Sequence, residues 1–359
     1  MKLKQILAVL SMAITLLLTL SGCTPGPKER TTLKVLFAGS LIIPFQALEE
    51  AYEARHPEID VQMEGHGSIQ VVRHVTEIHD LVDVAATADH SLIPMLMYTS
   101  RVPDTGQPYA DWYIKFATNR LALAYTPGSK YADEITPDNW YQVIARPGVK
   151  LGMADPRFDA SGYRALMALQ MAENWYDDII IFENVTMGRF NTPITAREEN
   201  GQTVIHVPEI VQPKPESGIV IRGASIQLIA LLESGDLDYA FEYESVIQQH
   251  SLQMVRLPDA LNLGLEQYAD QYSRVLVRLD FQRFASVKPE FKGEVICYGV
   301  TIPTNAPHPE QAVEFIAFLL GPEGRVVMEA NQQPLIIPPE AHHQDKMPGT
   351  LRDLCVPMP

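Results

Sequence analysis

The chain has 359 residues, and 44 acidic against 28 basic residues give it a formal net charge of −16 at pH 7. This acidity argues against non-specific binding of nucleic acid, which depends on a basic surface. It still allows a small anion, because backbone N–H groups and helix N-termini can bind one without cationic side chains. The length predicts two domains or lobes, and three cysteines are too few for a disulfide scaffold or a cysteine-rich zinc site.

The first 22 residues have the pattern of a secretory targeting segment. Two lysines precede an apolar run at 6–20, and the sequence Leu-Ser-Gly then leads directly to Cys23. Small residues before a cleavage point are typical of signal peptides, and a cysteine at this place resembles the acylated first residue of a lipoprotein. We therefore expect residues 1–22 to be a lipoprotein signal peptide, Cys23 to carry a lipid, and residues 23–32 to form a flexible tether on the extracytoplasmic face of the cell membrane. A plain signal peptide or a retained anchor is the alternative.

Three predicted strand–turn–helix units follow. Short β-leaning runs at 33–37, 59–63 and 82–86 each end in a small polar loop, and apolar residues at helical spacing come after each loop. Consecutive units of this kind predict an α/β fold with a parallel sheet and helices on its faces. Ligands bind outside the carboxyl ends of the strands in such sheets. The loops that carry Ser40 and Ser68 are therefore candidate binding loops.

The same pattern recurs farther along the chain. Predicted strands at 149–153 and 219–221 lead into polar loops that carry Asp159 and Ser225, and another predicted strand ends at Tyr243. These loops belong to a second predicted lobe, so strand ends of two lobes offer polar side chains to one site.

The chain is expected to cross twice between the lobes. Lobe 1 is predicted from residues 33–118 and 273–359, and lobe 2 from residues 119–272. Two crossings form a hinge, and a cleft between two α/β lobes is a common place for a ligand-binding site.

Two segments have weaker patterns. Residues 183–217 are predicted as an excursion from lobe 2, with a hairpin turn at Asn200-Gly201. Residues 334–339 contain several prolines and are predicted as a loop.

Several longer segments resemble a known family. They include LKVLFAGSL, EGHGSIQVVRHVTE, VDVAATADHSLI and VICYGVTIPTNAPHPEQAVEFIAFLLGPEG. The chain resembles the molybdate/tungstate-binding lipoproteins of ABC importers, in their archaeal-type branch. The resemblance implies a type II periplasmic-binding-protein fold, with two α/β lobes joined by a two-strand hinge. It also implies a monomer without cofactor or enzymatic activity that captures the oxyanion in the cleft and delivers it to a membrane permease driven by an ATPase.

The resemblance also implies roles for individual residues. Ser40 and Ser68 match serines that bind the oxyanion, and Tyr243 matches a tyrosine that faces the cleft. Archaeal-type members use two carboxylates that reach the Mo or W atom. Asp159 matches the first of them, whereas Ser225 stands where the second, a glutamate, is expected, and could donate a hydrogen bond instead. A carboxylate repels a dianion unless it binds the metal or carries a proton.

Other interpretations stay open at this point. Sulfate or phosphate could occupy the same site, because cavity size cannot be read from a sequence. A secreted hydrolase would need a nucleophile with a positioned base, and no such motif surrounds the three serines. Arg164 and Arg222 flank the predicted loops and could offset the charge of an anion, and Cys297 and Cys355 could form a disulfide outside the cell.

Overall fold

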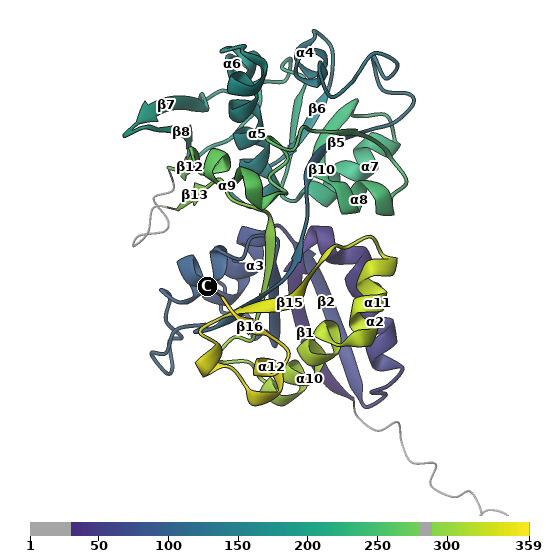
Figure 1. Cartoon of the computed structure of the whole chain (residues 1–359), viewed down its shortest axis with the longest axis vertical. Helices are drawn as coiled ribbons and strands as arrows, with labels where there is room; N and C mark the ends of the chain where they lie inside the picture. Colours follow the sequence, from purple (N-terminus) through teal and green to yellow (C-terminus); the bar gives the residue numbers. More distant parts are fainter. Residues whose placement is uncertain (1–29, 281–288, 359) are drawn as a thin grey trace, which may run out of the picture.

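The computed structural model describes residues 30–280 and 289–358 (Figure 1). The predicted signal peptide, Cys23 and most of the predicted tether lie outside the described residues. The last two tether residues, Thr31 and Thr32, belong instead to strand β1 (Thr31–Ala38), because their β-branched side chains suit a strand and β1 pairs along its whole length with β2 (Ile59–His66). Within the described part of the chain, no helix is long and apolar enough to cross a membrane.

A seven-stranded sheet forms the first lobe, in the order β16-β15-β4-β14-β3-β1-β2 (Figure 1). Strands β1, β2 and β3 run parallel to one another, as the sequence predicted. Apart from β1 and β2, the strands of this sheet are β3 (Val84–Thr87), β4 (Tyr113–Thr118), β14 (Cys297–Thr301), β15 (Leu335–His342) and β16 (Val356–Pro357). The helical elements of this lobe are η1 (Gly39–Leu41), α2 (Ile42–Glu53), α3 (Ser68–Thr76), η2 (Ile93–Met97), α10 (Pro309–Leu320), α11 (Pro322–Ala330), η5 (Gln344–Lys346) and α12 (Gly349–Arg352).

A five-stranded sheet forms the second lobe, in the order β11-β5-β10-β6-β9. Its strands are β5 (Leu121–Tyr125), β6 (Leu151–Ala154), β9 (Ile219–Arg222), β10 (Tyr239–Tyr243) and β11 (Gln253–Arg256). Strand β6 runs parallel to both β9 and β10, so the carboxyl ends of these three strands lie at one edge. The helical elements are α4 (Trp140–Ala145), α5 (Ala160–Tyr176), α6 (Ile181–Thr186), η3 (Ser225–Leu228), α7 (Ile229–Glu233), α8 (Glu244–Gln249), η4 (Glu266–Tyr268) and α9 (Ala269–Tyr272).

A third sheet of four strands lies beside the second lobe, in the order β13-β12-β8-β7 (Figure 1). Strands β7 (Thr195–Glu199) and β8 (Gln202–Val207) form the predicted hairpin, with positive φ at both turn residues. Strand β12 (Val275–Leu279) runs parallel to β8 and also pairs with β13 (Glu290–Lys292). The chain therefore returns to the seven-stranded sheet at β14, later than the predicted boundary at 273, because pairing with the hairpin holds β12 in this sheet.

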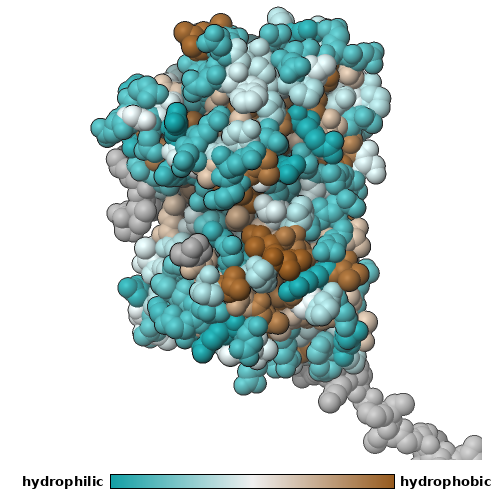
Figure 2. Space-filling view, in the orientation of Figure 1, coloured by the Kyte–Doolittle hydropathy of each residue, from teal (hydrophilic) through white to brown (hydrophobic). Residues whose placement is uncertain are grey.

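Helix α5 connects the two smaller sheets. Its residues from Ala160 to Ala172 are buried, and the rings of Tyr163 in α5 and Phe291 in β13 stack with 4.2 Å between centroids. The outer surface differs from this apolar interior: the face shown in Figure 2 is mostly hydrophilic, with apolar residues gathered on the seven-stranded lobe near the junction of the lobes.

The predicted loop at 334–339 is wrong, since these residues lie almost entirely in β15, which pairs antiparallel with β4. The register shifts between Leu335 and Glu340, and prolines are tolerated at such irregular positions because the ladder hydrogen bonds are already interrupted there.

The two cysteines of the described chain are free thiols, so the structure does not contain the Cys297–Cys355 disulfide. Burial raises the pKa of each thiol to about 11. Neither is therefore a reactive thiolate near neutral pH.

Candidate functional site

The carboxyl ends of strands from both lobes meet at one place. At the start of α3, the N–H of Ile69 donates a hydrogen bond to the carbonyl of Phe158 in the second lobe, at 3.0 Å. A Cβ on Gly67 would lie 2.4 Å from that carbonyl oxygen and 2.8 Å from the carbonyl oxygen of Gly223. Only glycine therefore permits this approach of the two lobes.

The first lobe brings neutral hydroxyl groups to this junction. Ser40 lies in η1, directly after β1, and its buried hydroxyl is 2.8 Å from the hydroxyl of Tyr298. Asn119, at the crossing between the lobes, donates to the same tyrosine oxygen at 3.1 Å. Ser68 is the first residue of α3, and its buried hydroxyl accepts a hydrogen bond from the N–H of Ala88 at 2.9 Å.

In the second lobe, Asp159 joins two strand ends. It is the N-cap of α5, where its Oδ1 accepts from the N–H of Ser161 at 2.8 Å, while its Oδ2 accepts from the N–H of Ser225 at 3.3 Å. Ser225 begins η3 after β9. Burial raises the pKa of the Asp159 carboxyl, although the hydrogen bonds from Ser161 and Ser225 oppose this.

A second acid, which the sequence analysis did not single out, lies next to Ser225. Glu242 is fully buried in β10, and its Oε1 accepts hydrogen bonds from the hydroxyl of Ser225 at 3.0 Å and from the N–H of Tyr243 at 2.8 Å. Its Oε2 is also buried, and no group in the described part of the chain forms a hydrogen bond with it. Burial raises the pKa of Glu242 to about 8; the N–H of Tyr243 opposes this shift, and the nearby Asp159 adds to it.

Arg164 is the cation of the site and connects the lobes. Its Nη1 group donates to the hydroxyl of Tyr243 at 2.7 Å and to the carbonyl of Ala88 in the first lobe at 2.8 Å. Its Nη2 lies 3.6 Å from the carboxylate of Asp89, to which Tyr163 also donates. Burial favours a high pKa for Asp89, but Arg164 and the other neighbours hold this pKa below its usual value.

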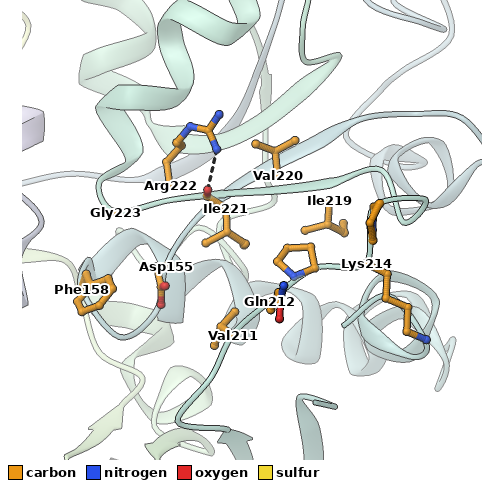
Figure 3. Close-up of a pocket in the computed structure, with 12 residues that line it drawn as sticks. Asp155, Phe158, Val211, Gln212, Lys214, Ile219, Val220, Ile221, Arg222 and Gly223 are labelled. Carbon is orange, nitrogen blue, oxygen red and sulfur yellow. Dashed lines mark hydrogen bonds between the residues drawn. The ribbon is translucent and has the colours of Figure 1, made fainter. Parts of the chain in front are cut away.

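The structure thus brings together all five side chains that the sequence singled out: Ser40, Ser68, Asp159, Ser225 and Tyr243 are buried at the lobe junction. Arg164 joins them, whereas Arg222 does not. The Arg222 side chain is exposed and donates to the carbonyl of Ile221 at 3.0 Å. Together with Asp155 and Phe158 it lines a separate pocket (Figure 3). None of the five predicted residues lines that pocket.

Each of the three serines that the sequence singled out has a defined hydroxyl contact. The partners of Ser40, Ser68 and Ser225 are a tyrosine hydroxyl, a backbone N–H and a carboxyl group. None of these three hydrogen bonds involves a histidine, which most often supplies the base to a catalytic serine.

Several polar residues of the site were missed from the sequence, among them Ser161 and Glu242, as well as Tyr298 beside Ser40. The Ser161 hydroxyl is buried and makes no hydrogen bond of normal geometry, although it lies close enough to Asp159 to lower the pKa of that carboxyl. Glu242 had a signal that could have been used, because it is the one charged residue in the strand sequence Tyr239–Tyr243. Charged residues are rarely fully buried unless they are paired.

Relatives with similar sequences cover nearly the whole chain. It is 38% identical over 368 residues to an uncharacterized solute-binding protein of Methanoculleus marisnigri, and the match spans 99% of each protein. It is 41% identical over 348 residues to a protein of Thermococcus kodakarensis named molybdate/tungstate-binding protein WtpA, spanning 93% of this chain and 92% of the relative.

Solved structures share the fold at low sequence identity. The periplasmic molybdate-binding protein of Azotobacter vinelandii matches with a TM-score of 0.52 and 15% identity, over 85% of this chain and 99% of that one. The sulfate-binding protein SubI of Mycobacterium tuberculosis matches with a TM-score of 0.55 and 14% identity, over 86% and 88%. These likenesses confirm the predicted type II periplasmic-binding-protein fold. The family model for bacterial extracellular solute-binding proteins matches residues 33–331, and the chain belongs to this family.

Proposed function

We propose that this protein captures molybdate or tungstate between its two lobes, on the extracytoplasmic face of the cell membrane, and delivers it to the permease of an ABC transporter. The observation that carries the proposal is the burial of Ser40, Ser68, Asp159, Ser225 and Tyr243 at one junction of two lobes. The name of the Thermococcus kodakarensis relative supports the choice of oxyanion. Cys23 would carry the lipid anchor of this binding protein.

The chemistry of the site suits a dehydrated dianion with four oxygen atoms. Hydroxyl groups of Ser40 and Ser68 can donate to these oxygens from the first lobe, and preorganised neutral donors need no buried countercharge. Arg164 adds a positive charge near Tyr243. Asp159 is the candidate for direct contact with the Mo or W atom, and its longer hydrogen bond, 3.3 Å from the N–H of Ser225, is the one that such a contact would replace.

Release would follow from separation of the lobes. Opening would pull Arg164 away from Ala88 and Asp89, and α3 away from Phe158. Because these contacts cross between the lobes next to the five site residues, the same motion would expose the bound oxyanion to water and to the permease.

A thermal-shift panel tests this function. The mature chain is mixed with equal concentrations of tungstate, molybdate, sulfate or phosphate, and its unfolding temperature is measured. Ligand at 100 times its Kd adds about 2.7 kcal/mol to the free energy of unfolding. We expect a shift with tungstate and molybdate only. A shift with sulfate or phosphate alone would change the ligand assignment, and no shift with any of the four would contradict the function.

A further inference from the structure

A buried carboxyl oxygen without a partner lies inside the candidate site. The side chain of Glu242 is 0% exposed, and among the residues that the structure describes its Oε1 accepts two hydrogen bonds while its Oε2 accepts none. Buried polar atoms in folded proteins nearly always have a hydrogen-bond partner, so each exception needs an explanation. At a ligand site, the natural explanation is a ligand atom.

The surroundings of Glu242 place this oxygen among the predicted binding residues. Ser225 stands between the two acids, since its N–H donates to Asp159 and its hydroxyl donates to Glu242. On the side of the first lobe, the ring of Tyr298 lies 6.2 Å from the ring of Tyr243, the residue after Glu242, and the Tyr298 hydroxyl contacts the hydroxyl of Ser40. Glu242 therefore lies next to Ser225 and the Asp159 turn, one residue before the tyrosine whose ring faces Tyr298.

Within residues 30–280 and 289–358, no cation forms a hydrogen bond or an ion pair with the carboxyl group of Glu242. The groups that face it are Asp159 from the start of α5, Tyr298 from β14 and Tyr243 from its own strand. Arg164 is nearby, but its hydrogen bonds go to Tyr243 and Ala88, and its ion pair is with Asp89. The neutral acid is therefore the favoured form, and burial raises the pKa of Glu242 to about 8.

We propose that Glu242 contacts the bound oxyanion as a neutral carboxylic acid, with its Oε2–H donating a hydrogen bond to an oxyanion oxygen. Oε1 is then the carbonyl oxygen, which agrees with the two hydrogen bonds that it accepts. This inference rests on the proposed function and adds a donor from the second lobe to the serine donors of the first. Ser225 becomes a positioning residue, because its hydroxyl orients the carboxyl group of Glu242.

Two substitutions test the contact by calorimetric titration with sodium tungstate at pH 7. Glu242→Gln keeps the shape and offers an amide N–H where the acid offers its O–H, so we expect an affinity close to wild type. Glu242→Ala removes the donor and should weaken binding about 10-fold. Glu244→Gln is the matched control, since this neighbouring acid pairs with Arg256 instead, at 3.7 Å, and we expect unchanged affinity.

The outcomes separate this inference from the proposed function. If the wild-type protein binds neither tungstate nor molybdate, the function itself fails. If the wild type binds and Glu242→Gln loses as much affinity as Glu242→Ala, the ionised carboxylate is required and the inference is wrong. It is also wrong if both variants bind like the wild type. Should Glu242→Ala not fold, as judged by its unfolding transition, Glu242→Asp replaces it, because the shorter acid withdraws the donor and should also weaken binding.

The positioning role of Ser225 has its own readout. Ser225→Ala should weaken tungstate binding in the wild-type background and add little further loss in the Glu242→Ala background. Such non-additivity is expected when one residue acts through another. Fully additive losses would overturn the positioning role.

Discussion

The two halves of the site differ in charge. The first lobe contributes the hydroxyl groups of Ser40, Ser68 and Tyr298, which are neutral near pH 7, while its buried Asp89 is paired with Arg164 of the second lobe. The second lobe contributes two buried acids, Asp159 and Glu242, with the pKa of each raised by burial.

Because of this difference, we expect the two lobes to contribute differently to affinity and to selectivity. Hydroxyl donors accept any oxyanion whose oxygens they can reach, because they recognise only an acceptor. A buried acid tolerates an anion only when it carries a proton or bonds to the central atom of that anion. We therefore expect the first lobe to supply general affinity for oxyanions and the second lobe to supply most of the selectivity among them.

The largest expected loss of tungstate affinity comes from replacing Asp159, a buried acid of the second lobe. Asp159→Ala should weaken tungstate binding about 100-fold, because hydrogen bonds and contacts of charged groups contribute about 1.5–3 kcal/mol. Calorimetry measures the affinity. Asp159→Asn is the control for the helix cap, since it keeps an acceptor for the N–H of Ser161. Unchanged or tighter binding by Asp159→Ala would make this aspartate a repulsive neighbour rather than a ligand.

The next prediction concerns Gly67→Ala and tests whether the two lobes must approach each other for the oxyanion to bind. In Gly67→Ala the new Cβ would lie 2.4 Å from the carbonyl oxygen of Phe158, so closure is obstructed while the φ of −63° suits alanine. Overpacking costs about 1–3 kcal/mol, and we expect tungstate affinity to fall about 10-fold or more. Gly349→Ala is the control, because its Cβ would meet nothing within 4 Å. Equal affinities of the two variants would show that binding does not need this approach of the lobes.

Smaller effects are expected in the neutral half. Ser40→Ala and Ser68→Ala each remove one donor, and a neutral hydrogen bond contributes about 0.5–1.5 kcal/mol, so each should weaken binding about 3- to 10-fold. The losses should be similar for tungstate and molybdate if this half supplies general affinity. If a serine variant changes the ratio of tungstate to molybdate affinity by a larger factor than it weakens tungstate binding, the first lobe contributes to selectivity. That result would contradict the proposed roles of the two lobes. Ser234→Ala, on the exposed end of α7, serves as the control.

A separate effect, on stability rather than on affinity, is a pH dependence of unfolding without ligand. The pKa of Glu242 rises from its usual 4.5 to about 8 on folding, so between these values the unfolded chain releases a proton that the folded chain keeps. Stability from this residue is therefore present below pH 4.5 and is lost as the pH rises towards 8. Thermal unfolding of the wild type should show a steeper loss from pH 5 to pH 8 than that of Glu242→Gln. Parallel curves would mean that Glu242 is ionised in the folded protein.

Local sequence patterns were enough to predict the strand ends at which the site residues lie. Each predicted strand–turn–helix unit needs only neighbouring residues, and parallel strands then bring their carboxyl ends to one edge. Ser40 and Ser68 could be located in this way, and so could the Asn200-Gly201 turn, because positive φ at both positions favours these residues.

Contacts between distant segments decided the rest. Residues 335–342 became a strand because β4 offers an edge for pairing, and β12 left the predicted first lobe because β8 lies beside it. Arg164 and Arg222 both follow predicted strands at the binding loops, so the sequence does not distinguish them, yet Arg164 is buried and Arg222 is exposed. Glu242 could be seen in the sequence only as an unusual residue in an apolar strand, and its burial against Ser225 and Asp159 depends on how η3 and α5 pack on β10. Such burial sets the protonation of an acid, which no local pattern encodes.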